Sequence, residues 1–143
     1  MTLKLKILGN KVPIPKHPDL AELEVVPHNW PDADCEVNIV CEEFTSMCPV
    51  TEQPDFATIE ISYAPRNHLI ESKALKLYLN SFRHHGVFAE DITVRICTDL
   101  ARALKPKWLE VRGNFRSRGG IKLMPVVRYK GGPVPKKRIS KKG

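Results

Sequence analysis

The sequence predicts one α+β domain in which an antiparallel four-stranded sheet is covered on one side by two helices. Apolar residues recur at every second position in four segments and at helical spacing in two, in the order strand, strand, helix, helix, strand, strand. The length of 143 residues allows one domain with loose ends but not two. Such a sheet leaves two edges unpaired, and oligomerisation into a closed barrel would cover them.

The first part of the chain predicts an arm followed by two strands. Five prolines interrupt residues 9–31, so we expect residues 1–34 to form an extended N-terminal arm that wraps the body or reaches a neighbouring chain. Residues 35–44 and 56–63 alternate apolar and polar side chains, which is typical of half-buried strands. The polar, proline-flanked residues 45–54 between them predict a loop.

The middle of the chain predicts two helices. Apolar residues recur at helical spacing over residues 70–83, and Gly86 supplies a helix stop. A second amphipathic helix runs over about residues 90–105, with acidic residues in its first turn, and Pro106 ends it.

Two further strands complete the predicted body. Residues 109–116 alternate as a strand, residues 117–120 form a turn, and residues 121–129 form a last strand in which Pro125 marks an edge or a bulge. The predicted body therefore spans residues 35–129. No internal repeat is visible.

The positive charge belongs mainly to the end of the chain. The formal net charge is +7, but residues 130–143 hold six basic residues and no acidic one, and the remainder has 17 basic and 16 acidic residues. We therefore interpret residues 130–143 as a flexible, solvated tail, and an RNA-binding module that uses this tail is the alternative. No apolar run reaches the ~20 residues of a membrane helix, so we expect a soluble, cytoplasmic protein.

The cysteines and histidines do not form a metal-binding pattern. The four cysteines include no CxxC pair, and the five histidines form no HxxxH or HExxH pattern. We expect free thiols in a reducing compartment and no metal. The chemistry is then left to side chains or to an organic cofactor.

One cysteine lies where a nucleophile is expected. Cys48 falls in the predicted loop, and Asp55 follows it at the start of the next strand. A loop cysteine beside a carboxylate can act as a nucleophile with a proton partner. A surface thiol and a strand-initiating aspartate are the alternative. The other three cysteines lie on strand or helix faces and are interpreted as core residues.

Two groups of residues at the helix starts are candidates for ligand binding. Ser72, Lys73 and Lys76 open the first helix and together suit a phosphate, although a solvated lysine face has the same pattern. Phe88 and Glu90 stand at the entry to the second helix and suit the face and the N–H edge of a purine-like ring. The alternative for this pair is a core anchor and a favourable charge at the helix N-terminus.

These segments resemble one known family. Residues 43–55 (Glu-Phe-Thr-Ser-Met-Cys-Pro-Val-Thr-Glu-Gln-Pro-Asp) and 71–78 (Glu-Ser-Lys-Ala-Leu-Lys-Leu-Tyr) are similar to the two signatures of QueF, the NADPH-dependent 7-cyano-7-deazaguanine (preQ0) reductases of queuosine biosynthesis. Residues 88–91 and 118–121 fall in register with it. The resemblance covers about residues 35–125 in the short, single-module form. It implies the ββααββ tunnel fold (T-fold) and homo-oligomeric rings with sites between subunits.

The resemblance also implies the chemistry. Cys48 adds as a thiolate to the nitrile carbon and forms a thioimide, and Asp55 donates a proton to the former nitrile nitrogen. Two hydrides from NADPH then give the primary amine, 7-aminomethyl-7-deazaguanine (preQ1), for transfer-RNA modification. Lys73 and Lys76 match the positions associated with the cofactor phosphates.

The substrate positions implied by the resemblance include one departure from the family pattern. Glu90 binds the guanine-like edge and Phe88 stacks on the ring. The residues implied to line the same pocket are Ile70, Glu71 and Ser72. Where the family has Phe-His-Glu, Ala89 replaces the histidine, and we expect the thioimide to form but its reduction to be slowed.

Two related enzymes are weighed against this interpretation. A QueF-like amidinotransferase adds ammonia to the same nitrile on transfer RNA, but the signature at residues 71–78 argues against it because that enzyme needs no NADPH. A zinc-dependent pterin cyclohydrolase shares the tunnel fold, but its metal ligands are missing here. We expect a small-molecule substrate, with no membrane and no direct nucleic-acid partner.

Overall fold

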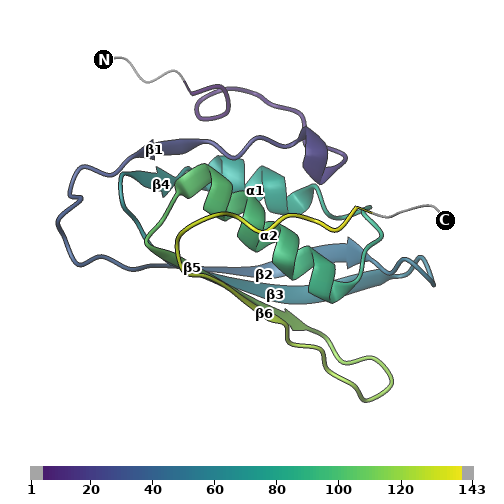
Figure 1. Cartoon of the computed structure of the whole chain (residues 1–143). Coiled ribbons are helices and arrows are strands. Elements are labelled where there is room, and N and C mark those ends of the chain that lie inside the picture. The colour runs from purple at the N-terminus through teal and green to yellow at the C-terminus, as the bar shows by residue number, and fades with distance from the viewer. Residues whose placement is uncertain (1–4, 140–143) are drawn as a thin grey trace.

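The computed structural model describes residues 5–139, and its main feature is an antiparallel four-stranded sheet with the strand order β2-β3-β5-β6. The strands of this sheet are β2 (Val37–Met47), β3 (Pro54–Ala64), β5 (Trp108–Phe115) and β6 (Val126–Tyr129). Helices α1 (Ser72–Asn80) and α2 (Ala89–Leu104) lie together over one face of this sheet (Figure 1). The predicted α+β architecture, with a four-stranded sheet beneath two helices, is confirmed.

A second, two-stranded sheet was not predicted. β1 (Val25–Pro27) pairs antiparallel with β4 (His68–Ile70), and a short 3-10 helix, η1 (Pro18–Leu20), precedes it. The predicted start of the first helix at Ile70 is therefore wrong. The Ile70 backbone N–H donates to the Tyr63 hydroxyl at 3.1 Å, and α1 begins two residues later, after its N-cap at Glu71.

The predicted loop over residues 45–54 is also too long. β2 and β3 stay paired as far as Met47 and Pro54, so the connection is only residues 48–53. A bulge between Cys41 and Phe44 shifts the alternation of β2, and after it Phe44 and Ser46 are the buried residues. The alternation in the sequence breaks at the bulge because the core-facing positions change phase there.

The C-terminal elements follow the prediction with one shortening. α2 ends at Leu104, because Lys105 takes a left-handed conformation (φ 48°) and Pro106 follows it. The last strand is only β6 instead of residues 121–129, since Pro125 has no N–H to add to the ladder. Within residues 5–139, no helix is both long enough and apolar enough to cross a membrane.

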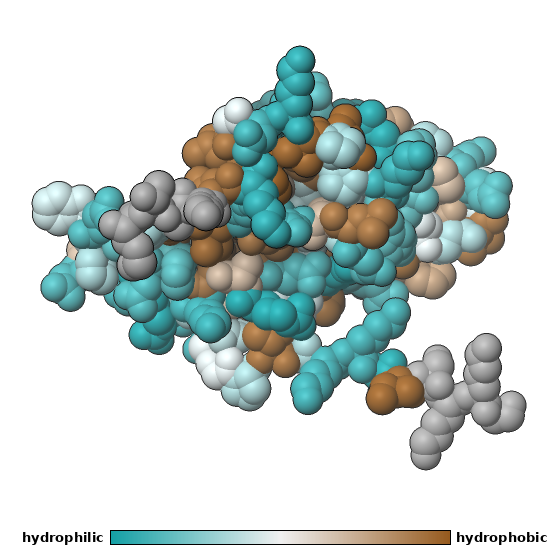
Figure 2. Space-filling view, turned by 90° about the horizontal axis from the view of Figure 1, so that it is seen from above, coloured by the Kyte–Doolittle hydropathy of each residue, from teal (hydrophilic) through white to brown (hydrophobic). Residues whose placement is uncertain are grey.

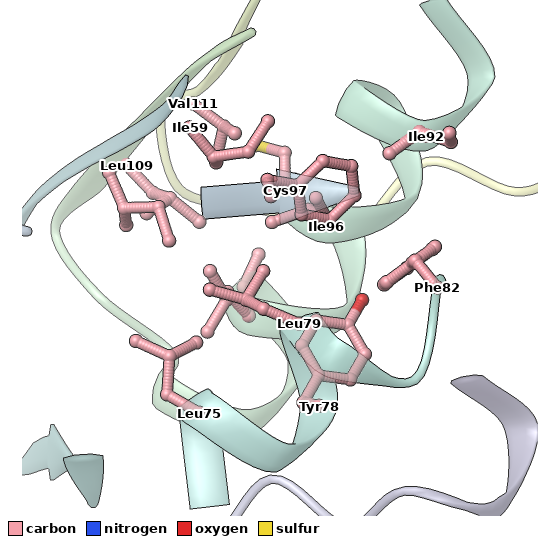
Figure 3. Close-up of a cluster of buried hydrophobic side chains, with 14 of the residues drawn as sticks. Ile59, Leu75, Tyr78, Leu79, Phe82, Ile92, Ile96, Cys97, Leu109 and Val111 are labelled. Atoms are coloured by element: carbon pink, nitrogen blue, oxygen red, sulfur yellow. The ribbon is translucent and has the colours of Figure 1, made fainter. Parts of the chain in front are cut away.

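The core lies between the helices and the large sheet. Figure 3 shows side chains from both layers pointing toward one another. The sheet contributes Ile59, Leu109 and Val111, and α2 contributes Ile92, Ile96 and Cys97. The labelled residues from α1 and the turn after it are Leu75, Tyr78, Leu79 and Phe82. This core fixes both helices on the sheet, so the ends of the elements are held in place.

The N-terminal arm packs on α1. Ile7 is buried against Ala74 and Leu77, and the Lys73 ammonium donates to the backbone carbonyls of Ile7 (3.0 Å) and Asn10. Viewed from above, this face shows apolar patches between hydrophilic side chains (Figure 2). The division into an arm (1–34), a body (35–129) and a tail (130–143) stays a prediction. Residues 1–4 of the arm and 140–143 of the tail lie outside the described residues.

Candidate active site

Cys48 lies in a tight turn at one end of the large sheet. Its backbone N–H donates to Gln53 O at 2.8 Å, and the Glu52 N–H donates to Cys48 O at 3.0 Å. Glu52 has a positive φ of 56°, which closes the turn. The residue before the turn, Met47, donates to His85 O at 3.3 Å and forms a parallel bridge with Gly86. The thiol is thereby held beside the segment that leads into α2.

The surroundings of Cys48 favour its thiolate. The pKa of Cys48 is lowered to about 7, first by a hydrogen bond from the Thr51 side chain and then by the backbone of Thr51 and Val50. Burial opposes this shift, and a hydrogen bond from Arg118 adds to it. Burial instead raises the pKa of Cys97 to about 11. Cys48 is therefore the thiol suited to nucleophilic attack at neutral pH.

Asp55 joins Cys48 at this end of the sheet. In the antiparallel pair of β2 and β3, Asp55 lies opposite Ser46, and Ser46 precedes Cys48 by two residues. Its Oδ1 lies 2.9 Å from Nη1 of Arg118, which approaches from the turn after β5. Sequence reasoning placed Asp55 correctly at the start of a strand but gave Arg118 no role of its own. The signal that could have identified Arg118 is the Arg-Gly-Gly-Ile sequence at residues 118–121, which was used only as part of the resemblance to the family.

The segment that opens α2 belongs to the same end of the sheet. Phe88 is the N-cap residue and is exposed, and Glu90 lies in the first turn. Ala89 packs partly against the core, and its carbonyl accepts from the Thr93 hydroxyl at 2.8 Å. Because Gly86 bridges to Met47, residues 88–90 lie only two to four residues along the chain from this contact, a reach of at most about 7–14 Å.

The start of α1 forms a second group of predicted site residues. The Glu71 carboxylate caps the helix by accepting from the N–H groups of Lys73 (3.0 Å) and Ala74 (2.7 Å). Ile70, Ser72 and Lys76 line a largely apolar hollow of about 460 Å³ between α1 and β2. The other lining residues include Val37, Ile39, Cys41, Tyr63, Leu75 and Leu79. Lys73 points instead to the arm, as described above.

Known proteins resemble this chain over most of its length. The family model described as QueF-like protein matches residues 54–133. The chain belongs to this family. It is 48% identical over 129 residues to the NADPH-dependent 7-cyano-7-deazaguanine reductase of Helicobacter pylori, covering 90% of this chain and 88% of that protein. The reductase of the same name from Parvibaculum lavamentivorans is 54% identical over 117 residues, covering 82% and 76%.

A solved structure shares the fold of this QueF-like chain. It is described as the archaeosine synthase QueF-Like in the apo form, and it aligns with a TM-score of 0.64 at 20% identity. The alignment covers 71% of this chain and 99% of that one. The likeness establishes a common fold.

The structure brings together only part of the predicted site. Cys48, Asp55 and residues 88–90 lie at the end of the sheet where β2 finishes, whereas the hollow beside α1 is lined by the first residues of β2, such as Ile39. An extended strand rises ~3.3 Å per residue, so Ile39 and Cys48 lie about 25–30 Å apart. Within one chain the Cys48 group and the α1 group are therefore separate.

Residues 5–139 contain no group of three or more histidine, cysteine or acidic side chains placed to hold a metal ion.

The Thr51 hydroxyl should control the titration of Cys48. In Thr51→Ala the largest cause of the lowered pKa is gone, so the pKa should rise from about 7 toward the ordinary value of 9.0. Less thiolate is then present at pH 7, and the midpoint of alkylation against pH should move upward. Iodoacetamide labelling of the Cys48 peptide, read by mass spectrometry, measures this midpoint. Thr98→Ala, on α2, is the matched control, and equal midpoints in both variants would contradict the assignment.

Proposed function

We propose that this protein reduces the nitrile of 7-cyano-7-deazaguanine to the primary amine of 7-aminomethyl-7-deazaguanine with NADPH, a step in queuosine biosynthesis. The observation that carries the proposal is the Cys48 thiol with a pKa of about 7 beside Asp55, in a chain about half identical to proteins named as such reductases. A thiolate is the nucleophile that a nitrile carbon requires, and a nearby carboxyl group can move the proton.

The first step uses only this chain's side chains and the substrate. Cys48 Sγ forms a bond to the nitrile carbon, one π bond of the nitrile breaks, and the proton from the thiol reaches the nitrogen through Asp55. The product is a thioimide, which accepts hydride more readily than the nitrile. NADPH, when bound, supplies the two hydrides of the four-electron reduction. The bond from Sγ to carbon breaks before the amine leaves, so the free thiol is restored.

The residues at the start of α1 suit the phosphates of NADPH. Lys73 contacts neutral carbonyl groups, so its positive charge is not compensated by a carboxylate there. Lys76 is exposed and forms no ion pair within residues 5–139. Two uncompensated ammonium groups one turn apart match an anionic dinucleotide. Lys73 and Lys76 are therefore the residues that would hold the cofactor.

The ring of the substrate is assigned to the helix starts. The exposed Phe88 offers an aromatic face, and Glu90 offers a carboxylate to the N–H edge of a guanine-like base. Ile70, Glu71 and Ser72 complete the pocket in this proposal. Since both Glu71 carboxylate oxygens already accept helix N–H groups, Glu71 also fixes the direction in which α1 begins.

We also infer a tunnel fold that closes by homo-oligomerisation. Within residues 5–139, β2 and β6 each pair on one side only, so the large sheet has two free edges. In this proposal the Cys48 group and the α1 group are two half-sites, which lie at opposite ends of β2 and cannot meet inside one chain. A second copy that extends the sheet would bring the α1 group of one chain to the Cys48 group of the next.

An NADPH assay tests the function. Adding the free nitrile base should oxidise NADPH, with two NADPH consumed for each nitrile, because four electrons are needed. The same base without its nitrile, 7-deazaguanine, is the control and should cause no oxidation. No oxidation with the nitrile, together with ammonia incorporation into preQ0-containing transfer RNA, would favour the amidinotransferase. Tight transfer-RNA binding without either reaction would favour the RNA-binding module.

A further inference from the structure

Arg118 is fixed at the turn that follows β5. Its backbone exchanges hydrogen bonds with Ile121, at 2.9 Å from the Arg118 N–H and 3.0 Å from the Ile121 N–H. Gly119 and Gly120 between them have positive φ values of 58° and 79°, which the turn requires. The turn therefore sets the position from which the guanidinium group extends.

The guanidinium group of Arg118 reaches both ends of the Cys48 turn. Nη1 lies 2.9 Å from Asp55 Oδ1, and Nη2 donates to Gln53 Oε1 at 3.4 Å. A hydrogen bond from the same side chain contributes to the lowered pKa of Cys48. One rigid, planar cation thus contacts the two reactive groups and Gln53, whose carbonyl accepts from the Cys48 N–H.

We propose that Arg118 is a positioning residue that holds Cys48 and Asp55 together in their reactive arrangement. This inference rests on the proposed function of that pair. Arg118 occupies Oδ1 of Asp55 and leaves Oδ2 for the proton that passes from the thiol to the nitrile nitrogen. It also supplies one positive charge between a thiolate and a carboxylate, which would otherwise repel each other.

Other charged groups around the turn do not replace this cation. Glu52, within the turn, is exposed and carries the opposite charge. His85, whose carbonyl accepts from the Met47 N–H, lies in the segment after α1. Burial lowers the pKa of His85, and the positive charges of His17 and Arg95 lower it further, so a proton on His85 is disfavoured. Glu90, at the start of α2, is acidic as well. Loss of Arg118 should therefore leave the thiolate among negative or neutral neighbours.

The test compares Arg118→Gln, Arg118→Lys and Arg116→Gln with the unchanged protein. Arg116 belongs to the same connection, is exposed, and has no side-chain hydrogen bond or ion pair within residues 5–139, so Arg116→Gln is the matched loss of charge. The first readout is the pH midpoint of Cys48 alkylation without substrate. The second is the rate of the Cys48 adduct with the nitrile, followed by mass spectrometry of the intact chain.

We expect Arg118→Gln to raise the alkylation midpoint by at least about half a pH unit and to slow adduct formation about tenfold. Arg118→Lys keeps the charge but not the planar fork, so the midpoint should recover more than the adduct rate. Arg116→Gln should match the unchanged protein in both. Equal midpoints and equal adduct rates in Arg118→Gln and Arg116→Gln would overturn the proposal.

The two readouts also separate this proposal from the proposed function. If the unchanged protein forms no adduct with the nitrile, the proposed function fails. The alkylation midpoint needs no substrate, so a raised midpoint in Arg118→Gln would still support the contact with the thiol, and an unchanged one would overturn it.

Discussion

Replacing Cys48 with alanine should lower NADPH oxidation by at least about a thousandfold, to the level of the reaction without enzyme. Alanine has no nucleophile, so the nitrile carbon is never converted into a thioimide. The remaining pocket still binds the base, but a nitrile without covalent activation is a poor hydride acceptor. The measurement is the fall in NADPH absorbance after the nitrile base is added, together with the mass of the intact chain.

Two further variants define what Cys48 contributes. Cys48→Ser keeps the size of the side chain, but a serine hydroxyl is scarcely ionised at neutral pH, so we expect the same loss. Cys35→Ala removes another partly exposed thiol and should retain activity near that of the unchanged protein. If Cys48→Ala kept more than a tenth of the activity, a covalent mechanism through Cys48 would be ruled out.

Mixing two variants, each changed in one of the two groups of site residues, tests whether the site is shared between chains. Cys48→Ala lacks the reactive group, and Ser72→Ala has a changed α1 half-site. In a shared site, the Ser72→Ala chain supplies Cys48 while the Cys48→Ala chain supplies Ser72. Some sites in a mixed oligomer are then intact, so activity should exceed that of either variant alone. Activity that equals the average of the two would indicate that each chain builds its own site.

The fold was predictable where local patterns and long-range pairing agree. The alternation in β3 and β5 and the helical spacing in α2 correctly identified the large sheet and the helical layer that packs on it. The pairing of β1 with β4 was missed because Val25–Pro27 is a three-residue strand in a proline-rich segment, and only its distant partner makes it a strand. The end of β2 was missed because the bulge after Cys41 reverses which positions face the core.

The residues of the candidate site also divide into those that a local sequence pattern identifies and those that only the folded structure brings together. Cys48 and Asp55 were identifiable because a short loop keeps them close in sequence as well as in space. Arg118 lies more than sixty residues from Asp55, and only the pairing of β3 with β5 brings its turn to the Cys48 loop. Lys73 was predicted to bind a phosphate, with a solvated lysine face as the alternative. Neither includes its contact with the arm, which depends on the packing of Ile7 and which no local pattern encodes.

Introducing the family's histidine as Ala89→His should raise turnover by about a hundredfold, the lower end of what a positioned proton-transfer group contributes. Residue 89 is the first residue of α2, at the same end of the sheet as Cys48 and Asp55. The Ala89 side chain cannot donate a proton, so in the proposed mechanism reduction of the thioimide would depend on slower donors. An imidazole there would supply protons while the amine forms. The positive N-terminal end of α2 would lower the pKa of this imidazole, and the two acids Glu90 and Asp91 would raise it.

Measuring adduct formation and adduct reduction separately distinguishes a proton-transfer role of residue 89 from a general effect on substrate binding. In the proposed mechanism Cys48 performs the addition, so the rate of adduct formation should be the same in Ala89→His and in the unchanged protein. The adduct should then disappear faster in Ala89→His when NADPH is added, and rapid mixing with mass spectrometry measures both steps. Ala89→Gln is the matched control, because glutamine is similar in size and polarity but does not exchange protons near neutral pH. Equal turnover in the histidine and glutamine variants would show that residue 89 contributes only shape, and the slow step would then lie elsewhere.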